Sequence, residues 1–166
     1  LPQITGSSLV RLFASRQSND SAAELVANCA LLQAILVAVE DNKVMAEQLV
    51  ALCPSLAQLN PSHSLLSVLQ ILCLLQCARS LPGVKPDLSS ICNFLIDCLC
   101  ASLPDAETIK NDPQSVKATF EVLELATEAF ELLISLSPSQ VGKLLKSSKA
   151  AQELFKLPFA LANFWS

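Results

Sequence analysis

The sequence predicts an all-α fold: a right-handed stack of helical hairpins with about seven or eight helices. Leu, Ala, Ser, Gln and Glu dominate the composition, Tyr is absent and glycine occurs only 3 times, which favours helices over sheets. Hydrophobic residues make up 52% of the chain and charged residues 16%, so the chain can bury a core and is not disordered. Prolines recur at spacings that divide the chain into helix-sized segments.

Prolines and capping residues set the expected boundaries, because proline suits the first turn of a helix and breaks its interior. Ser21 and Glu24 form a capping-box pattern, and Asp87 is an expected cap. Asn60, Asp112 and Ser137 each precede a proline as a cap. The expected helices cover residues 8–15, 21–40, 43–52, 61–79, 87–102, 113–136, 139–146 and 149–155, and an apolar segment follows at 157–165.

The two most apolar helices, 61–79 and 87–102, are expected at the centre of the stack. A helix without a polar face must be covered on several sides, so the flanking hairpins are expected from 21–52 and 113–146. The longest apolar stretch, 65–78, is interrupted by Ser67, Gln70 and Gln76 and is shorter than the roughly 20 residues of a membrane span. We therefore expect a buried core helix and no membrane span.

The stretch from Leu49 to Leu59, followed by Pro61 and the leucine-rich run from Leu65 to Leu75, has a short helix, a turn and a long helix. This pattern resembles armadillo- and HEAT-type α-solenoids over residues 21–146. The resemblance implies a rigid scaffold that binds peptides or helices. We expect one helical-repeat domain over 1–166, and because the chain starts at Leu1 without Met, we expect it to belong to a longer protein.

Cysteine usage indicates a reducing compartment, the cytoplasm or the nucleus. The chain has 7 cysteines, an odd number, and most lie among Leu and Ile, which is typical of small buried apolar residues. Cys73 and Cys77 have a zinc-like spacing, but no matching second pair follows, and the single histidine, His63, is distant in sequence. No metal or other cofactor is expected.

The sequence contains no clear catalytic motif. Nucleophilic catalysis by cysteine needs a base and an orienting group, and His63 is expected to be a surface residue in the first turn of its helix. The 3 glycines are scattered, so no glycine-rich loop could hold phosphates. We expect no enzymatic activity.

The clearest surface pattern is an acidic ridge on the helix 113–136. Its members follow spacings of 3, 4 and 3 residues, which places them on one helical face: Glu121, Glu124, Glu128 and Glu131. The opposite face is apolar: Val122, Leu125, Ala126, Ala129, Phe130 and Leu133. The acidic ridge is interpreted either as a docking surface for a basic or amphipathic segment of another protein or as an ordinary solvated face.

A basic cluster follows near the end of the chain: Lys143, Lys146, Lys149 and Lys156. It suggests anion binding, to nucleic acid or to anionic headgroups, or contact with the acidic ridge of a second copy; ordinary surface lysines are the alternative. A net charge of −4 argues against extensive nucleic-acid binding.

The apolar end segment is the third candidate. Phe159, Phe164 and Trp165 would bind a partner if exposed, or would close the open end of the stack. Taken together, these patterns predict a protein–protein interaction scaffold that forms part of a larger complex. Anion binding and homodimerisation are the alternatives.

Overall fold

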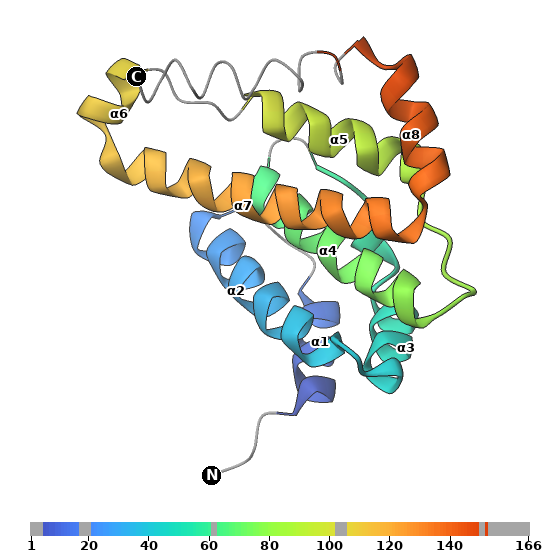
Figure 1. Ribbon diagram of the computed structural model, residues 1–166. Coiled ribbons are helices and arrows are strands. Elements are labelled where there is room, and N and C mark those ends of the chain that lie inside the picture. The colour runs from blue at the N-terminus through green and yellow to red at the C-terminus, as the bar shows by residue number, and fades with distance from the viewer. Residues whose placement is uncertain (1–4, 17–20, 61–62, 102–105, 150–151, 153–166) are drawn as a thin grey trace. The chain divides into compact units, whose positions relative to one another are not determined.

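A computed structural model describes residues 5–16, 21–60, 63–101, 106–149 and 152, and all regular structure in these residues is helical (Figure 1). The predicted all-α class is therefore confirmed for the described part of the chain. The chain forms two compact units, Leu1–Pro86 and Asp87–Ser166, and each is described by itself below. A right-handed, armadillo-like stack over 1–166 stays a prediction.

The first unit contains α1 (Gly6–Ser15), α2 (Ala22–Val39), α3 (Lys43–Leu52), the 3-10 helix η1 (Pro54–Ala57) and α4 (Ser64–Ser80). The most extensive packing in this unit joins α2 to α4, and α3 and η1 cover further sides of α4. Helix α1 packs against α2 and α3. Gly6 permits this close approach, because a Cβ at this position would lie 3.2 Å from the Ala38 Cβ and from the Met45 Sδ.

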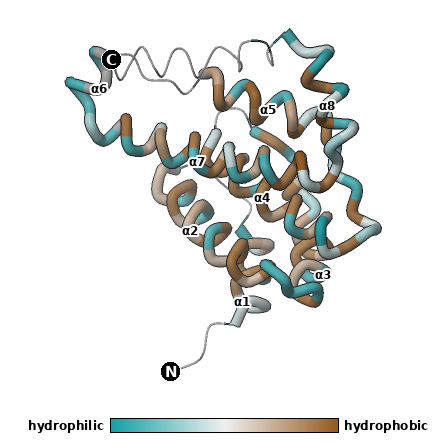
Figure 2. Tube along the Cα trace, viewed as in Figure 1, coloured by the Kyte–Doolittle hydropathy of each residue, from teal (hydrophilic) through white to brown (hydrophobic). Residues whose placement is uncertain are grey.

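Helix α4 is the core of the first unit. Every residue from Leu66 to Leu75 is buried, including the polar Ser67 and Gln70. Most residues of this helix are hydrophobic (Figure 2), and the buried ones follow one another along the chain rather than forming one stripe. The expectation of a buried core helix at 65–78 is confirmed, since α2, α3 and η1 together cover its surface.

Local capping explains how α2 and α3 begin. The Ser21 Oγ accepts a hydrogen bond from the Glu24 amide while a Glu24 carboxylate oxygen accepts one from the Ser21 amide, so the predicted capping box is present. Asp41 has a φ of 55°, which turns the chain after α2. The Asn42 Oδ1 then accepts from the Met45 amide and caps α3.

The predicted start of the fourth helix is wrong. Helix α4 begins at Ser64 and follows His63, which makes no side-chain capping bond. Asn60 instead lies outside the helix, where its backbone N–H donates to the Ser67 Oγ and its carbonyl accepts from the same hydroxyl, at 3.0 and 2.9 Å. His63 is half-buried, not a surface residue in the first turn as predicted. Pro61 lies outside the described residues.

The second unit contains α5 (Leu88–Ala101), α6 (Ala106–Asn111), α7 (Pro113–Leu136) and α8 (Pro138–Ser147). Helix α7 packs against α5, α6 and α8, and α5 also packs against α8. The proline signals placed the starts of α7 and α8 correctly within one residue, whereas α6 was not predicted. Ser137 does not cap α8 with its side chain; its hydroxyl donates to the Gln140 Oε1.

Asp87 caps α5 as predicted. One carboxylate oxygen accepts from the Ser90 amide at 3.2 Å and the other from the Ser90 hydroxyl at 2.7 Å. These bonds to Ser90, the side-chain bond foremost, lower the pKa of the Asp87 carboxyl, because they stabilise its charged form. Of the predicted helix 149–155, only Lys149 and Gln152 are described, and both are helical. The apolar segment 157–165 lies outside the described residues.

Candidate partner-binding surfaces

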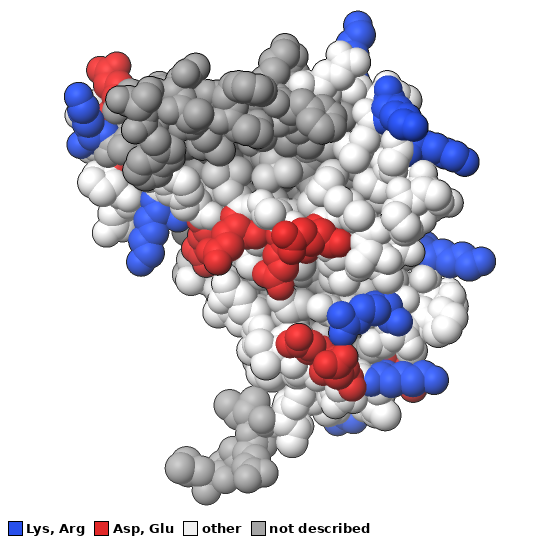
Figure 3. All heavy atoms as spheres, viewed as in Figure 1, with Lys and Arg blue, Asp and Glu red and all other residues white. Residues whose placement is uncertain are grey.

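The acidic ridge lies on the exposed side of α7. All 4 of its carboxylates are exposed, and Figure 3 shows acidic side chains gathered in a band over this helix. Glu121 and Glu131 are ten positions apart on the helix, or about 15 Å along its axis. Helix α7 therefore presents a continuous line of negative charge rather than isolated surface acids.

Apolar side chains accompany this charge, a feature that the sequence analysis missed. An open hollow on α7 is lined by Phe120, Leu123 and Thr127 together with Glu124, Glu128 and Glu131. Phe120 has 43% of its surface exposed, and Ile134, further along the helix, has 39%. The signal was present in the sequence, because Phe120 lies four residues before Glu124 and so shares its face. The ridge combines carboxylates with accessible apolar surface.

The opposite face of α7 holds the helix in the second unit. Ala126, Ala129 and Leu133 are fully buried, and Val122, Leu125 and Phe130 are half-buried. The predicted division of α7 into an acidic side and an apolar side therefore matches the burial of its residues. Because the buried side anchors α7, substitutions on the acidic ridge change the surface and leave the packing intact.

The described members of the basic cluster lie on or just beyond α8. Lys143, Lys146 and Lys149 are all exposed, and Figure 3 shows basic side chains gathered near this helix. Lys146 lies in the last turn of α8, where a positive charge is favoured by the helix dipole. Lys156, Phe159, Phe164 and Trp165 lie outside the described residues.

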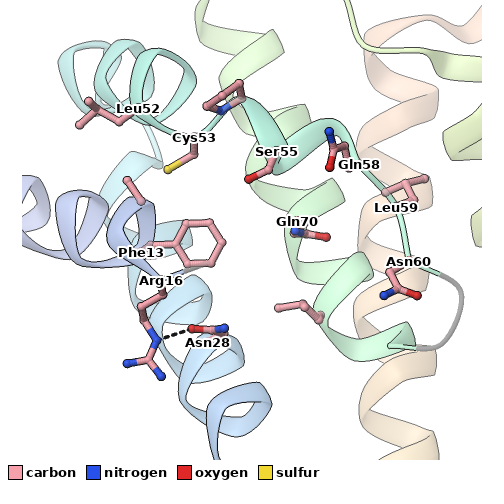
Figure 4. A pocket seen from close by; sticks show the side chains of 13 residues that line it. Phe13, Arg16, Asn28, Leu52, Cys53, Ser55, Gln58, Leu59, Asn60 and Gln70 are labelled. Carbon is pink, nitrogen blue, oxygen red and sulfur yellow. Dashed lines mark hydrogen bonds between the residues drawn. The ribbon is translucent and has the colours of Figure 1, made fainter. Parts of the chain in front are cut away.

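A second candidate site, absent from the sequence analysis, is a cavity of about 690 Å³ in the first unit. Its walls come from α1, α2, α4 and the segment around η1 (Figure 4), and we call it the α1–α4 cavity. The Arg16 Nε donates to the Asn28 Oδ1 at 2.6 Å, and Asn28 is only 2% exposed. Gln70 also lines the cavity, and its Oε1 has no hydrogen-bond partner among the described residues.

Sequence reasoning missed the α1–α4 cavity because its residues are far apart in the chain. Arg16, Asn28, Ser55 and Gln70 come from four different segments. The available signal was a pair of amides, Asn28 and Gln70, within otherwise apolar helical runs.

The thiols of α4 are buried in the apolar core. The Cys73 Sγ donates to the Leu32 carbonyl at 3.8 Å, and the Cys77 Sγ donates to the Ala46 carbonyl at 3.9 Å. Burial raises the pKa of Cys77 from its usual 9.0 to about 11, and burial raises that of Cys73 as well. Burial also raises the pKa values of Cys53 and Cys92. Neutral, buried thiols of this kind are poor nucleophiles and poor metal ligands at neutral pH.

No cluster of three or more metal-ligating side chains occurs in the described part of the chain. The described cysteines form no disulfide, and all but Cys100 are buried. These thiols fill space in the helical core.

Helix α2 has an apolar outer face. Val26 and Val37 are 69% and 73% exposed, and Ala23, Ala27, Ala30 and Ala34 are exposed along the same side. By length and composition α2 is the one described helix that could cross a membrane, with a mean hydropathy of 2.0 over 18 residues, 33% of them buried. The core helix of a soluble protein and a signal sequence meet the same criterion, so this finding alone carries little weight.

Comparison with known proteins identifies no relative. No family model matches the chain, and no curated protein or solved structure is similar to it.

Proposed function

We propose that this protein is a protein–protein interaction scaffold whose acidic ridge binds a basic, amphipathic helix or peptide of a partner. The supporting observation is the combination on α7 of exposed carboxylates with the exposed side chain of Phe120. Charged groups steer a partner to a surface, and apolar contact supplies much of the binding free energy. An amphipathic basic helix meets both requirements.

The charge pattern itself favours such a partner. Like charges three and four residues apart on a helix repel each other by about 0.2–0.5 kcal/mol per pair. A partner with lysines or arginines at matching spacing relieves this repulsion in the bound state. The armadillo- or HEAT-like arrangement belongs to this proposal, because stacked helices form a rigid support for such a ridge.

The scaffold is further proposed to act in a reducing compartment as part of a larger complex and to have no enzymatic activity. Thiols such as Cys73 and Cys77, neutral and buried in the core, suit the cytoplasm or the nucleus. His63, the one histidine of the sequence, is half-buried at the start of α4, and its side chain makes no capping bond.

Fluorescence anisotropy of the full chain with a labelled leucine–lysine helix, about 18 residues long, tests the proposal. The double substitution Glu124→Gln and Glu128→Gln is expected to weaken binding about three- to tenfold. Glu40→Gln with Glu47→Gln, the same charge change at exposed positions in the first unit, is the matched control and should bind normally. A scrambled peptide of the same composition should bind more weakly, because its charges and leucines no longer form two faces.

Equal weakening by both double variants would show a general charge effect and remove the acidic ridge from the proposal. Phe120→Ser tests the apolar contribution separately. The substitution should weaken binding without lowering the salt dependence, since it removes no charge.

Anion binding by the basic cluster is a second candidate, favoured by the exposure of Lys143, Lys146 and Lys149 around one end of α8. Binding to single-stranded nucleic acid or to anionic vesicles should fall steeply with added salt, because counterions are released. Replacing all three lysines by glutamine should abolish this anion binding. A salt-independent signal, or none at low salt, would eliminate this candidate.

A further inference from the structure

We infer that the α1–α4 cavity binds an N-acylated amino acid or the carboxyl terminus of a peptide. Three features of the cavity define such a ligand: one cationic group, one buried acceptor without a partner among the described residues, and a wall that is apolar in part. Its volume of about 690 Å³ lies within the range of small-molecule sites, about 300–1,000 Å³. The site lies within the first unit and is independent of the acidic ridge.

The cationic group is the Arg16 guanidinium. Arg16 follows directly after α1. Its backbone N–H donates to the Phe13 carbonyl, and this hydrogen bond fixes the position of the Arg16 backbone from which the side chain extends. Its Nε donates to the buried Asn28 Oδ1 at 2.6 Å (Figure 4), which orients the guanidinium plane. The remaining N–H donors of the guanidinium are on its two terminal nitrogens. None of the described lining residues is an Asp or Glu, so among these residues the charge of Arg16 has no acidic counterpart.

The orphaned acceptor is the Oε1 of Gln70. Gln70 is only 9% exposed, and this oxygen has no hydrogen-bond partner among the described residues. A buried carbonyl oxygen without a donor is costly, and the usual remedy is a ligand or a water molecule. An amide N–H of a ligand supplies the missing donor.

The apolar part of the wall determines the rest of the ligand. The ring of Phe13 and the amide of Gln70 face the same space, with Ser55 and Gln58 on another side (Figure 4). Leu66 and Leu59 add aliphatic surface. The Ser67 hydroxyl accepts a hydrogen bond from the Asn60 N–H and donates one to the Asn60 carbonyl. This part of the cavity wall is therefore already in place before a ligand binds.

These requirements favour a monoanionic carboxylate over a phosphate. One guanidinium neutralises one negative charge, and the described lining residues offer no second cationic side chain for another. The ligand therefore combines a carboxylate for Arg16, an N–H for Gln70 and an aliphatic side chain for the pocket around Phe13.

Isothermal titration of the full chain with N-acetyl-dileucine and with its C-terminal amide tests the inference. The free acid is expected to bind at least about tenfold more tightly than the amide, because only the acid pairs with the guanidinium. Arg16→Gln should remove this difference. Arg11, on the exposed side of α1, lies outside the cavity, so Arg11→Gln is the matched control and should retain the preference for the free acid.

Gln70→Met separates a ligand-binding role from a structural one. The substitution replaces the orphaned amide by an apolar group of similar shape, so the melting temperature of the free protein should rise. Affinity for both the acid and the amide should fall by about tenfold. A structural glutamine would give the opposite result, a lower melting temperature with unchanged affinity.

The length of the probe distinguishes the two sources of the carboxylate. N-acetyl-leucine as the better ligand would indicate a free acylated amino acid, and tighter binding of longer N-acetyl peptides would indicate a chain terminus. Equal affinity for acid and amide, an unchanged preference in the Arg16→Gln variant, or no heat of binding at about 10 mM probe would overturn the inference.

Discussion

Helices α2 and α4 share an apolar character but differ in how deeply they are buried. Both are apolar with almost no separation of polar and apolar faces, and both lie in the first unit. Yet α4 is buried continuously from Leu66 to Leu75, whereas α2 exposes Val26 and Val37. Each of the two helices packs on three other elements, so the comparison teaches that the placement of the neighbours around a helix, and not their number, decides how much of an apolar helix is buried.

The largest expected effect comes from removing a core side chain of α4. Leu72 is fully buried, so Leu72→Ala should lower the free energy of unfolding by about 2–5 kcal/mol, through lost burial and a residual cavity. Urea denaturation followed by circular dichroism measures the change. A loss below about 1 kcal/mol would mean that α4 is not the closely packed centre of the first unit.

The second effect concerns how the free energy of unfolding depends on pH through the Cys77 thiol of α4. The folded state raises the pKa of Cys77 from 9.0 to about 11, so its neutral form stabilises the fold fully below pH 9. This stabilisation is lost as the pH rises through 11, which lowers the free energy of unfolding by about 1–2 kcal/mol.

Urea denaturation at pH 7, 9 and 10.5 measures this loss. Cys77→Ala should be less stable than the natural sequence at pH 7, because it leaves a small cavity, but should lose less stability between pH 9 and pH 10.5. Cys100→Ala, which removes a half-buried thiol from the second unit, should retain the original slope. The same slope in both variants would rule out Cys77 as the source.

The third effect concerns the N-terminal capping of α2 and α4. Helix α2 has a capping box at Ser21, whereas His63 at the start of α4 makes no capping bond. Ser21→Ala should therefore destabilise the protein by about 1 kcal/mol, and His63→Ala should change stability by less than about 0.5 kcal/mol. Thermal unfolding of both variants checks the difference, and an equal loss would show that capping does not distinguish the two helices.

The smallest effect is expected on the outer face of α2. Val37 is 73% exposed, so Val37→Lys should change the free energy of unfolding by no more than about 0.5 kcal/mol. Val39→Lys, two residues away at a fully buried position, is the matched contrast and should prevent stable folding. If Val37→Lys were as damaging, the outer face of α2 would be covered in the folded protein.

The sequence by itself determined most of the helices, though not α6 or the start of α4, and it determined the polarity of α7. Proline positions, the Ser21 capping box and the Asp87 cap are local signals, so they were readable without a fold. The glutamate spacing on α7 was equally local, because helical periodicity alone puts Glu124 and Glu128 on one side. The start of α4 was misread since Asn60 bonds through its backbone to Ser67 rather than capping the helix.

Only the tertiary structure decided what surrounds each helix. Helix α2 packs on α1, α3 and α4, and α4 packs on α2, α3 and η1, so their different burial depends on which sides these neighbours cover, which no periodicity encodes. The α1–α4 cavity likewise exists because packing brings Arg16, Asn28 and Gln70 together from separate helices and from the end of α1. Local sequence fixes backbone hydrogen bonds within a helix, whereas cavities and covered faces arise from contacts between residues distant in the chain.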